Sequence, residues 1–283
     1  MKIVVNADDL GYSAHRDRGI FDCFQKGYIS AASLMVNGPT AVAAAGQAVE
    51  VGLCMGLHLN LTEGAPVAGN VSSLIHADGT MYYKNEFWAM SRNPSPTFLE
   101  DVKKEAVAQL ERFKLLSGQY PNHVDGHQHV HIAPGVATVL AGVFATYGVT
   151  SVRIPDEDVS EMDWLPDEKR KRYENRYFDA IKARIIYKKH GIVAPECFVG
   201  LGLCGTDMTH ERMTAALKNT YGMVECMVHP GHMGTATEPF NDPFDSSPDR
   251  LHEYAMLNFF ADRILIEWND VCQNVDTETC LKK

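Results

Sequence analysis

Four short motifs along the chain place acids and histidines where apolar runs end. The first, Asn6–Gly11, has two adjacent acids, Asp8 and Asp9, after an apolar run and before a glycine turn. The second, Gly56–Asn60, places His58 between two leucines. By itself the first motif is more typical of a helix N-cap than of an active site. The second is at least as typical of a histidine in the core.

The third and fourth motifs are richer in histidine. Asp125–His131 contains histidines at every second position from 127, and His229–His232 contains two more after a later apolar run. In an extended segment the three histidines of the third motif would point to one side, and imidazole is the commonest ligand for transition metals. In the alternative interpretation, the three histidines are unrelated surface residues and Asp125 only forms a turn.

All four motifs are expected at the same end of a sheet. The carboxyl ends of parallel strands gather at one end of an α/β fold, where active sites lie. Neighbouring strand residues point to opposite sides, so Asp8 and Asp9 can face one cleft only if the chain bends there. One acid plus two histidines leaves coordination positions open. The motifs together therefore predict a catalytic metal site.

Short β-rich runs alternate with helical stretches, which predicts a mainly parallel sheet with helices outside it. The expected strands are Lys2–Ala7, Ala31–Asn37, Leu53–Leu61, the run around His123–Asp125, Thr150–Ile154, Cys197–Leu203 and Met223–Val228. The expected helices are Arg18–Tyr28, Pro96–Leu116, one opened by Pro134, Asp167–His190 and one that starts at Ser247. About seven strands, rather than eight, predict a deformed or incomplete (β/α) barrel.

The length of 283 residues suits one barrel domain over residues 1–283. Two turn-rich segments, near 65–96 and 234–248, are long for connections, and such insertions usually cover or line a site. Four aromatic side chains of the first segment could stack on a sugar, although aromatic side chains more often serve packing. They are Tyr82, Tyr83, Phe87 and Trp88.

Composition narrows the range of partners. The formal net charge of −10 argues against nucleic acid or an anionic membrane as a partner, but not against an anionic substrate held by local arginines. The chain starts with a strand-like run rather than a secretory signal, and its longest apolar stretches fall short of a membrane span. Seven scattered cysteines without a CxxC pair are typical of reduced thiols, so we expect a cytoplasmic protein.

Several motifs, in order along nearly the whole chain, resemble those of the YdjC-like carbohydrate deacetylases, the family of bacterial chitooligosaccharide deacetylase. They are ADDLGY (7–12), VNG (36–38), GLHLNL (56–61), HVDGHQHVH (123–131), VRIPDE (152–157) and VHPGH (228–232). The resemblance implies a deformed (β/α) barrel related to the polysaccharide deacetylases. It also implies a hydrolase that removes N-acetyl groups from small, chitobiose-like sugars.

The resemblance further implies roles for single residues. The implied ligands of a divalent ion are Asp9, His58 and His127. The implied catalytic residues are Asp8 as general base, His229 as general acid and Arg153 as a support for the acids. His232 competes with His229 for the role of the acid, and His129 and His131 are candidates for contacts with substrate or with a ligand.

Amide hydrolysis requires an activated water, stabilisation of charge on the carbonyl oxygen and a proton for the leaving amine. A metal can serve the first two needs, an ionised Asp8 can accept the proton of the water, and a protonated His229 can protonate the amine. Mixed oxygen and nitrogen ligands suit zinc, cobalt, manganese or nickel, and magnesium when waters complete its shell. Asp125 could instead hold an imidazole in the required tautomer.

Three other functions are compatible with parts of this pattern. A non-haem iron oxygenase also uses two histidines and a carboxylate, although strand–helix alternation fits it poorly. A non-catalytic sugar-binding protein could retain the fold, but Asp8 and His229 are both present. An amidohydrolase-type enzyme would place its His-x-His pair after the first strand, whereas here the pair lies mid-chain. We further expect no nucleic-acid or membrane partner, and a homodimer is compatible with the sequence.

Overall fold

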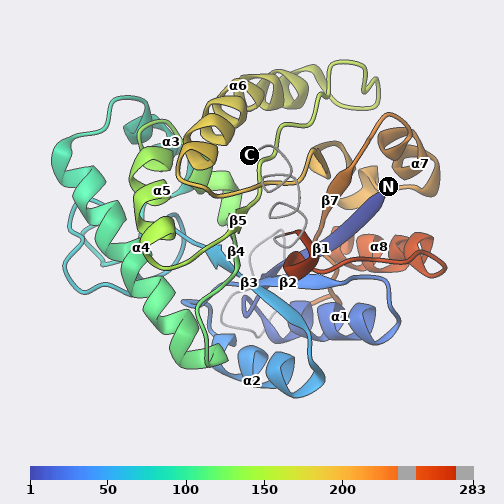
Figure 1. Cartoon of the computed structure of the whole chain (residues 1–283), viewed down its shortest axis with the longest axis horizontal. Coiled ribbons are helices and arrows are strands. Elements are labelled where there is room, and N and C mark those ends of the chain that lie inside the picture. Colours follow the sequence, from blue (N-terminus) through green and yellow to red (C-terminus); the bar gives the residue numbers. More distant parts are fainter. Residues whose placement is uncertain (235–246, 272–283) are drawn as a thin grey trace, which may run out of the picture.

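The fold is built on one sheet of seven parallel strands. The computed structural model describes residues 1–234 and 247–271. The strand order is β5-β4-β3-β2-β1-β7-β6, so the first strand lies inside the sheet between β2 and β7. Figure 1 shows the sheet curled into a half-barrel. The strands are β1 (Lys2–Leu10), β2 (Ala31–Leu34), β3 (Cys54–Leu59), β4 (His123–Gly126), β5 (Ser151–Val152), β6 (Cys197–Val199) and β7 (Met223–Val228).

The helices alternate with the strands and surround the curled sheet (Figure 1). They are α1 (Ala14–Gln25), α2 (Ala41–Val51), α3 (Lys84–Arg92), α4 (Pro96–Ser117), α5 (Val136–Thr146), α6 (Asp167–Lys189), α7 (His210–Lys218) and α8 (Pro248–Met256). None of the helices in the described ranges combines the length and apolar character needed to cross a membrane. The predicted α/β fold with about seven parallel strands in an incomplete barrel is confirmed, since β5 and β6 form the two edges of the sheet.

Local sequence explains where several helices begin and end. The Ser13 hydroxyl accepts a hydrogen bond from the Arg16 amide at the start of α1, and Ser95 does the same for Phe98 at the start of α4. Pro96 occupies the first turn of α4, where its missing N–H costs nothing. Gly118 ends α4 with a φ of +87°, which glycine adopts without steric cost.

Some predicted boundaries are wrong. Strand β5 has only two residues rather than the five of Thr150–Ile154, and α5 begins at Val136, two residues after Pro134. Helix α1 starts earlier than predicted, at Ala14. Helix α3 lies within the insertion 65–96, where no helix was predicted. Of the second predicted insertion, 234–248, residues 235–246 lie outside the described part of the chain.

The curled sheet carries buried charged and polar groups in addition to its apolar core. Asn6 of β1, Asp125 of β4 and Glu225 of β7 are all fully buried, as is Arg153, which follows β5. Buried charges are stable only when they are paired or hydrogen-bonded. These side chains therefore have to form one network, and this network positions the site.

Candidate active site

A backbone irregularity at the end of β1 brings both acids of the first motif to one cavity. The register of β1 against β2 shifts between Ala7 and Leu10, and Asp9 has a φ of +67°. A bulge of this kind re-aims side chains that would otherwise alternate between faces. Asp8 and Asp9 accordingly both line the same cavity, which has a volume of about 370 Å³. The predicted bend is confirmed.

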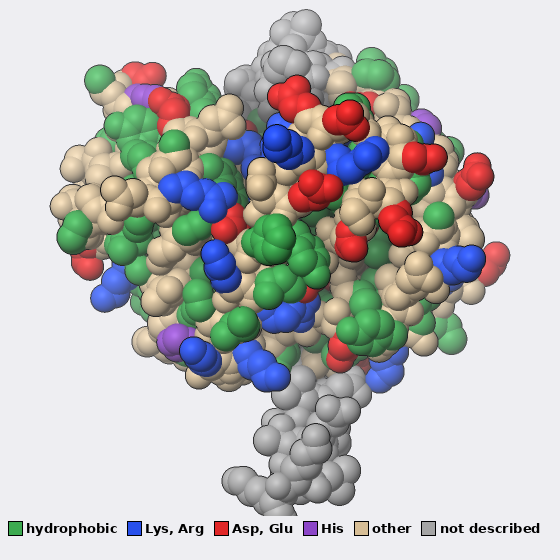
Figure 2. All heavy atoms as spheres, turned by 90° about the horizontal axis from the view of Figure 1, so that it is seen from above, with side chains coloured by type: hydrophobic (Ala, Val, Ile, Leu, Met, Phe, Trp, Pro, Cys, Tyr) green, Lys and Arg blue, Asp and Glu red, His purple; other side chains and the backbone are tan. Residues whose placement is uncertain are grey.

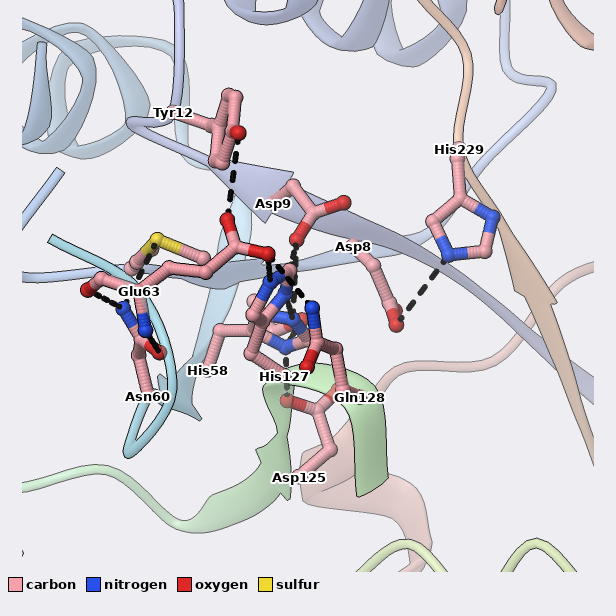
Figure 3. A network of polar contacts seen from close by, with 12 residues as sticks. Asp8, Asp9, Tyr12, His58, Asn60, Glu63, Asp125, His127, Gln128 and His229 are labelled. Atoms are coloured by element: carbon pink, nitrogen blue, oxygen red, sulfur yellow. Dashed lines mark hydrogen bonds and ion pairs between the residues drawn. The ribbon is translucent and has the colours of Figure 1, made fainter. Parts of the chain in front are cut away.

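Asp9, His58 and His127 converge on one point (Figure 3). Asp9 Oδ1 lies 3.1 Å from His58 Nε2 and 2.9 Å from His127 Nδ1, and these two nitrogens lie 3.3 Å apart. One carboxylate oxygen and two imidazole nitrogens are a donor set suited to a divalent transition metal. The three residues therefore form a candidate metal site, whose ligand atoms lie within 4.8 Å of one another.

A second layer of residues fixes the orientation of these side chains. Asp125 Oδ1 lies 2.7 Å from His58 Nδ1, so that Nε2 of this ring is left facing Asp9. Glu63 Oε1 lies 3.2 Å from His127 Nε2, and Arg16 Nη1 donates to Asp9 Oδ2 at 2.5 Å. A carboxylate behind a histidine is the usual way to hold a metal-binding imidazole in one tautomer. The suggested tautomer-fixing role of Asp125 thus agrees with the geometry.

The same contacts shift the pKa values of the donor groups. Burial alone would raise the pKa of Asp9, but Arg16 and the neighbouring histidines hold it well below its usual range. Burial alone would lower the pKa of His58, but Asp125 and Asp9 raise it to about 10. Asp9 is therefore an ionised donor. In the absence of a cation, the pKa values of both His58 and His127 are raised, so both rings hold a proton more tightly than an ordinary histidine does.

Asp8 is held by a buried arginine. Arg153 donates two hydrogen bonds to the Asp8 carboxylate, at 2.5 and 2.6 Å, and also contacts Asp125 at 3.0 Å and Glu225 at 2.6 Å. Burial alone would lower the pKa of Arg153, but the three nearby carboxylates hold it well above its usual range. Burial also raises the pKa of Glu225 to about 8, so at neutral pH Arg153 mainly neutralises Asp8 and Asp125. One cation thus links the end of β5 to β1, β4 and β7.

His229 lies directly after β7 and faces the first strand. Its Nε2 is 3.8 Å from Asp8 Oδ2, and its ring lines the same cavity (Figure 3). Glu253 of α8 holds it from behind by accepting a hydrogen bond from the His229 amide at 2.6 Å and lying 3.6 Å from Nδ1. His232, in contrast, contacts Asp22 of α1 at 2.8 Å and does not line the cavity. Of the two histidines, only His229 lines the cavity.

The third motif is not an extended segment, so the prediction that its three histidines point to one side is wrong. His127–Ile132 forms a tight 3₁₀ turn in which Gln128 and His129 have positive φ values of 54° and 60°. The turn sends His127 to the candidate metal site and His129 to another part of the cavity wall. His131 points into the core, where its Nε2 lies 2.9 Å from the Arg153 carbonyl oxygen.

Four residues of the site were not predicted from sequence. Glu225 had a visible signal, because a charged residue within a buried apolar strand must have a partner. Arg16, Glu63 and Glu253 had none, since they lie in a helix or a turn where charged residues are common. The cavity lining does not include Tyr82, Tyr83, Phe87 or Trp88, and the packing interpretation holds for buried Phe87 and Trp88.

Comparison with known proteins gives consistent matches over most of the chain. The model of the "YdjC-like protein" family matches residues 2–259. A carbohydrate deacetylase from Xenopus laevis is 34% identical over 290 residues, covering 92% of this chain and 94% of the relative. A chitooligosaccharide deacetylase from Serratia marcescens is 35% identical over 149 residues, covering 52% of this chain and 57% of the relative.

One solved structure has the same fold. It is a protein from Enterococcus faecalis V583 that is provisionally assigned to cellobiose-phosphate cleavage. It aligns with a TM-score of 0.71 at 20% identity, over 96% of this chain and 98% of its own. The curled sheet and its helices are therefore a fold already observed by experiment.

Proposed function

The chain belongs to the YdjC-like protein family, and from this premise we propose that it is a metal-dependent carbohydrate deacetylase. Its substrate would be a small N-acetylated amino sugar of the chitooligosaccharide type, and its products acetate and the free amine. One observation carries the proposal. Asp9, His58 and His127 converge in a cavity that also contains Asp8, held by Arg153, and His229.

We propose that Asp9, His58 and His127 hold a divalent ion. The mutual approach of their donor atoms and the carboxylates behind both histidines support this assignment. A bound ion would supply Lewis-acid chemistry, which lowers the pKa of water and polarises the carbonyl of the acetyl group. Zinc suits the mixed nitrogen and oxygen donors best, and magnesium, cobalt, manganese and nickel are the other candidates.

We propose that Asp8 is the general base. A general base must be ionised and must lie within reach of the proton that it accepts. The two hydrogen bonds from Arg153 stabilise the charged carboxylate and fix its direction. Asp8 also lines the same cavity as Asp9, His58 and His127, in which a metal-activated water would attack. Arg153 is accordingly a positioning residue, which acts through Asp8.

His229 is the proposed general acid. The leaving amine needs a proton when the C–N bond breaks, and imidazolium can supply it near neutral pH. Because β7 pairs with β1, His229 stands beside Asp8 but on the far side from Asp9 and His127 (Figure 3). Proton removal and proton delivery can thus occur at two points of one cavity.

Acetate release tests the proposed function. Full-length protein loaded with zinc, and separately with magnesium, is incubated with N-acetylglucosamine, chitobiose and chitotriose, and free acetate and free amine are measured together. We expect equal amounts of both products. Oxygen uptake with an oxo-acid cosubstrate would favour the iron oxygenase instead, and tight sugar binding without any product would favour the sugar-binding protein.

Metal binding should release protons. Without a cation His58 stays protonated up to its pKa of about 10, whereas coordination through Nε2 requires the neutral ring. The apparent metal affinity should therefore rise with pH between about 6 and 9. Calorimetry at pH 8, in two buffers that differ in ionisation enthalpy, measures the number of released protons. Equal heats in both buffers would show that no proton leaves the site.

His229→Ala should remove the alkaline limb of the pH profile. The account requires His229 to be protonated and Asp8 to be ionised, so kcat/KM should be bell-shaped in the wild type. The variant should lose more activity on N-acetyl substrates than on activated esters, whose leaving groups need little proton assistance. His232→Ala is the matched control and should keep the bell shape. Equal losses on amides and esters, with an unchanged alkaline limb, would assign the acid to another residue.

A further inference from the structure

A second cavity, of about 870 Å³, lies apart from the candidate active site. It is lined by α6, α7, β6 and the segment between β5 and α6, and none of its lining residues also lines the active-site cavity. Its volume falls within the range of about 300–1,000 Å³ that is usual for small-molecule sites. The proposed reaction uses none of its residues, so this second cavity is available for another ligand.

The second cavity has an acidic lining. Two basic residues line it, Arg184 and Lys218, and the carboxylates are more numerous: Asp156, Glu157, Asp158, Glu161 and Glu196. Arg184 is already paired with Asp156 at 2.8 Å, and within residues 1–234 and 247–271 none of the other four acids forms an ion pair. On the face shown in Figure 2, acidic and basic side chains lie beside one another. The second cavity therefore has a local excess of carboxylates that are not paired with a basic side chain.

Glu157 is the buried acid of this lining, with only 6% of the residue exposed. Its Oε2 accepts hydrogen bonds from the amides of Gly200, Leu201 and Gly202, at 3.1, 2.6 and 3.2 Å. Its Oε1 has no hydrogen-bond partner in the described part of the chain. Burial raises the pKa of Glu157 to about 7, although the three amides lower it. A buried carboxylate oxygen without a donor is costly, so a ligand that donates to it would be stabilised there.

Two tyrosine rings add apolar surface to the second cavity. Tyr177 lies on α6, and Tyr221, which lies just before β7, is 67% exposed. Aromatic rings offer a large apolar contact area, and their faces attract cations. A cavity that combines such rings with unpaired carboxylates suits a ligand with an ammonium group on an otherwise uncharged ring. An amino sugar is a ligand of this kind.

We propose that the second cavity binds the ammonium group of a free amino sugar, with Glu157 as its main acceptor. Deacetylation would produce such an amine, so the choice of ligand rests on the proposed function. An ammonium group carries three N–H donors and the positive charge that the lining lacks, whereas the acetamido group of a substrate is neutral. The second cavity would thus distinguish product from substrate by charge. Glu157 also joins it to the active site, because it holds the turn whose Leu201 lines the active-site cavity.

Amine binding tests the inference separately from turnover. Full-length protein loaded with zinc is titrated by calorimetry with glucosamine, with glucose, in which a hydroxyl replaces the amine, and with ethanolamine, an amine without a sugar ring. We expect glucosamine to bind about tenfold or more tightly than glucose, the usual worth of a hydrogen bond to a charged group, and also more tightly than ethanolamine. Acetate release enters none of these measurements, so a failed deacetylase assay and a failed binding test remain distinguishable.

Variants locate the amine. Glu157→Gln keeps an acceptor for the turn amides but removes the charge, and it should weaken glucosamine binding about tenfold and leave glucose binding unchanged. Glu161→Gln, at an exposed position of the same lining, should weaken it about two- to fivefold, and this variant provides the test if Glu157→Gln does not fold.

Glu174→Gln is the matched control. It removes an exposed charge of α6 that lines neither cavity, so it should not alter glucosamine binding. Equal binding of glucosamine and glucose, or a preference for glucosamine that survives both Glu157→Gln and Glu161→Gln, would overturn the inference. Ethanolamine that binds as tightly as glucosamine would overturn the assignment of an amino sugar.

Discussion

Asp8→Asn should keep the metal and lose the reaction. The substitution preserves shape and one oxygen for Arg153, but an amide cannot accept the proton of the attacking water. We expect kcat to fall by about two to four orders of magnitude, the usual worth of a general base. Metal content, measured by elemental analysis of dialysed protein, should stay at the wild-type level. Thermal unfolding should also be measured, because Arg153 keeps Asp125 as a partner but loses one charged contact.

Asp9→Asn is the matched control for this prediction. It makes the same chemical change one residue further along, at a side chain that faces His58 and His127 rather than Arg153. We expect this variant to bind metal weakly and to regain part of its activity at high metal concentration. If both variants lost metal equally, and neither selectively lost rate, the division of roles between the two acids would be wrong.

His58→Ala and His127→Ala should each remove the metal. Substituting a residue that merely orients a ligand typically weakens metal binding by about 10- to 100-fold, so loss of a ligand should weaken it by more than about 100-fold. Only three protein donors are proposed, so each substitution leaves two of them. Competition with a chelator measures the affinity, and activity should fall in parallel.

A histidine outside the site provides the control. His190 is exposed at the end of α6, so His190→Ala should leave both metal affinity and activity unchanged. Substituting Asp125 with Asn should give an intermediate loss of affinity, because His58 would keep its ligand atom but lose the carboxylate that orients it. Wild-type affinity in both His58→Ala and His127→Ala would exclude these two residues as ligands.

Much of the fold could be predicted because its signals are local. Apolar runs such as Met223–Val228 gave strand positions, and their alternation with helical segments gave a parallel sheet. The strand ends then placed the four motifs together, because parallel strands all end on one side. The resemblance to known motifs added the choice of Asp9, His58 and His127 as ligands and the division of roles between Asp8 and Asp9, which spacing alone could not provide.

The remainder depends on contacts between residues far apart in the chain. Nothing in the sequence around Asp125–His131 shows that Gln128 and His129 adopt positive φ values, so an extended segment was the natural expectation. The network around Arg153 joins residues from four strands or strand ends, and only the folded chain brings them together.

The central claim is that acetate release depends on a metal held by this chain. The most direct measurement is the rate of acetate release from chitobiose by chelator-treated, demonstrably metal-free protein, followed as zinc or magnesium is added back. The account predicts no release without metal and a rise that levels off at about one ion per chain, in line with a single three-ligand site. Undiminished acetate release by the metal-free protein would contradict it.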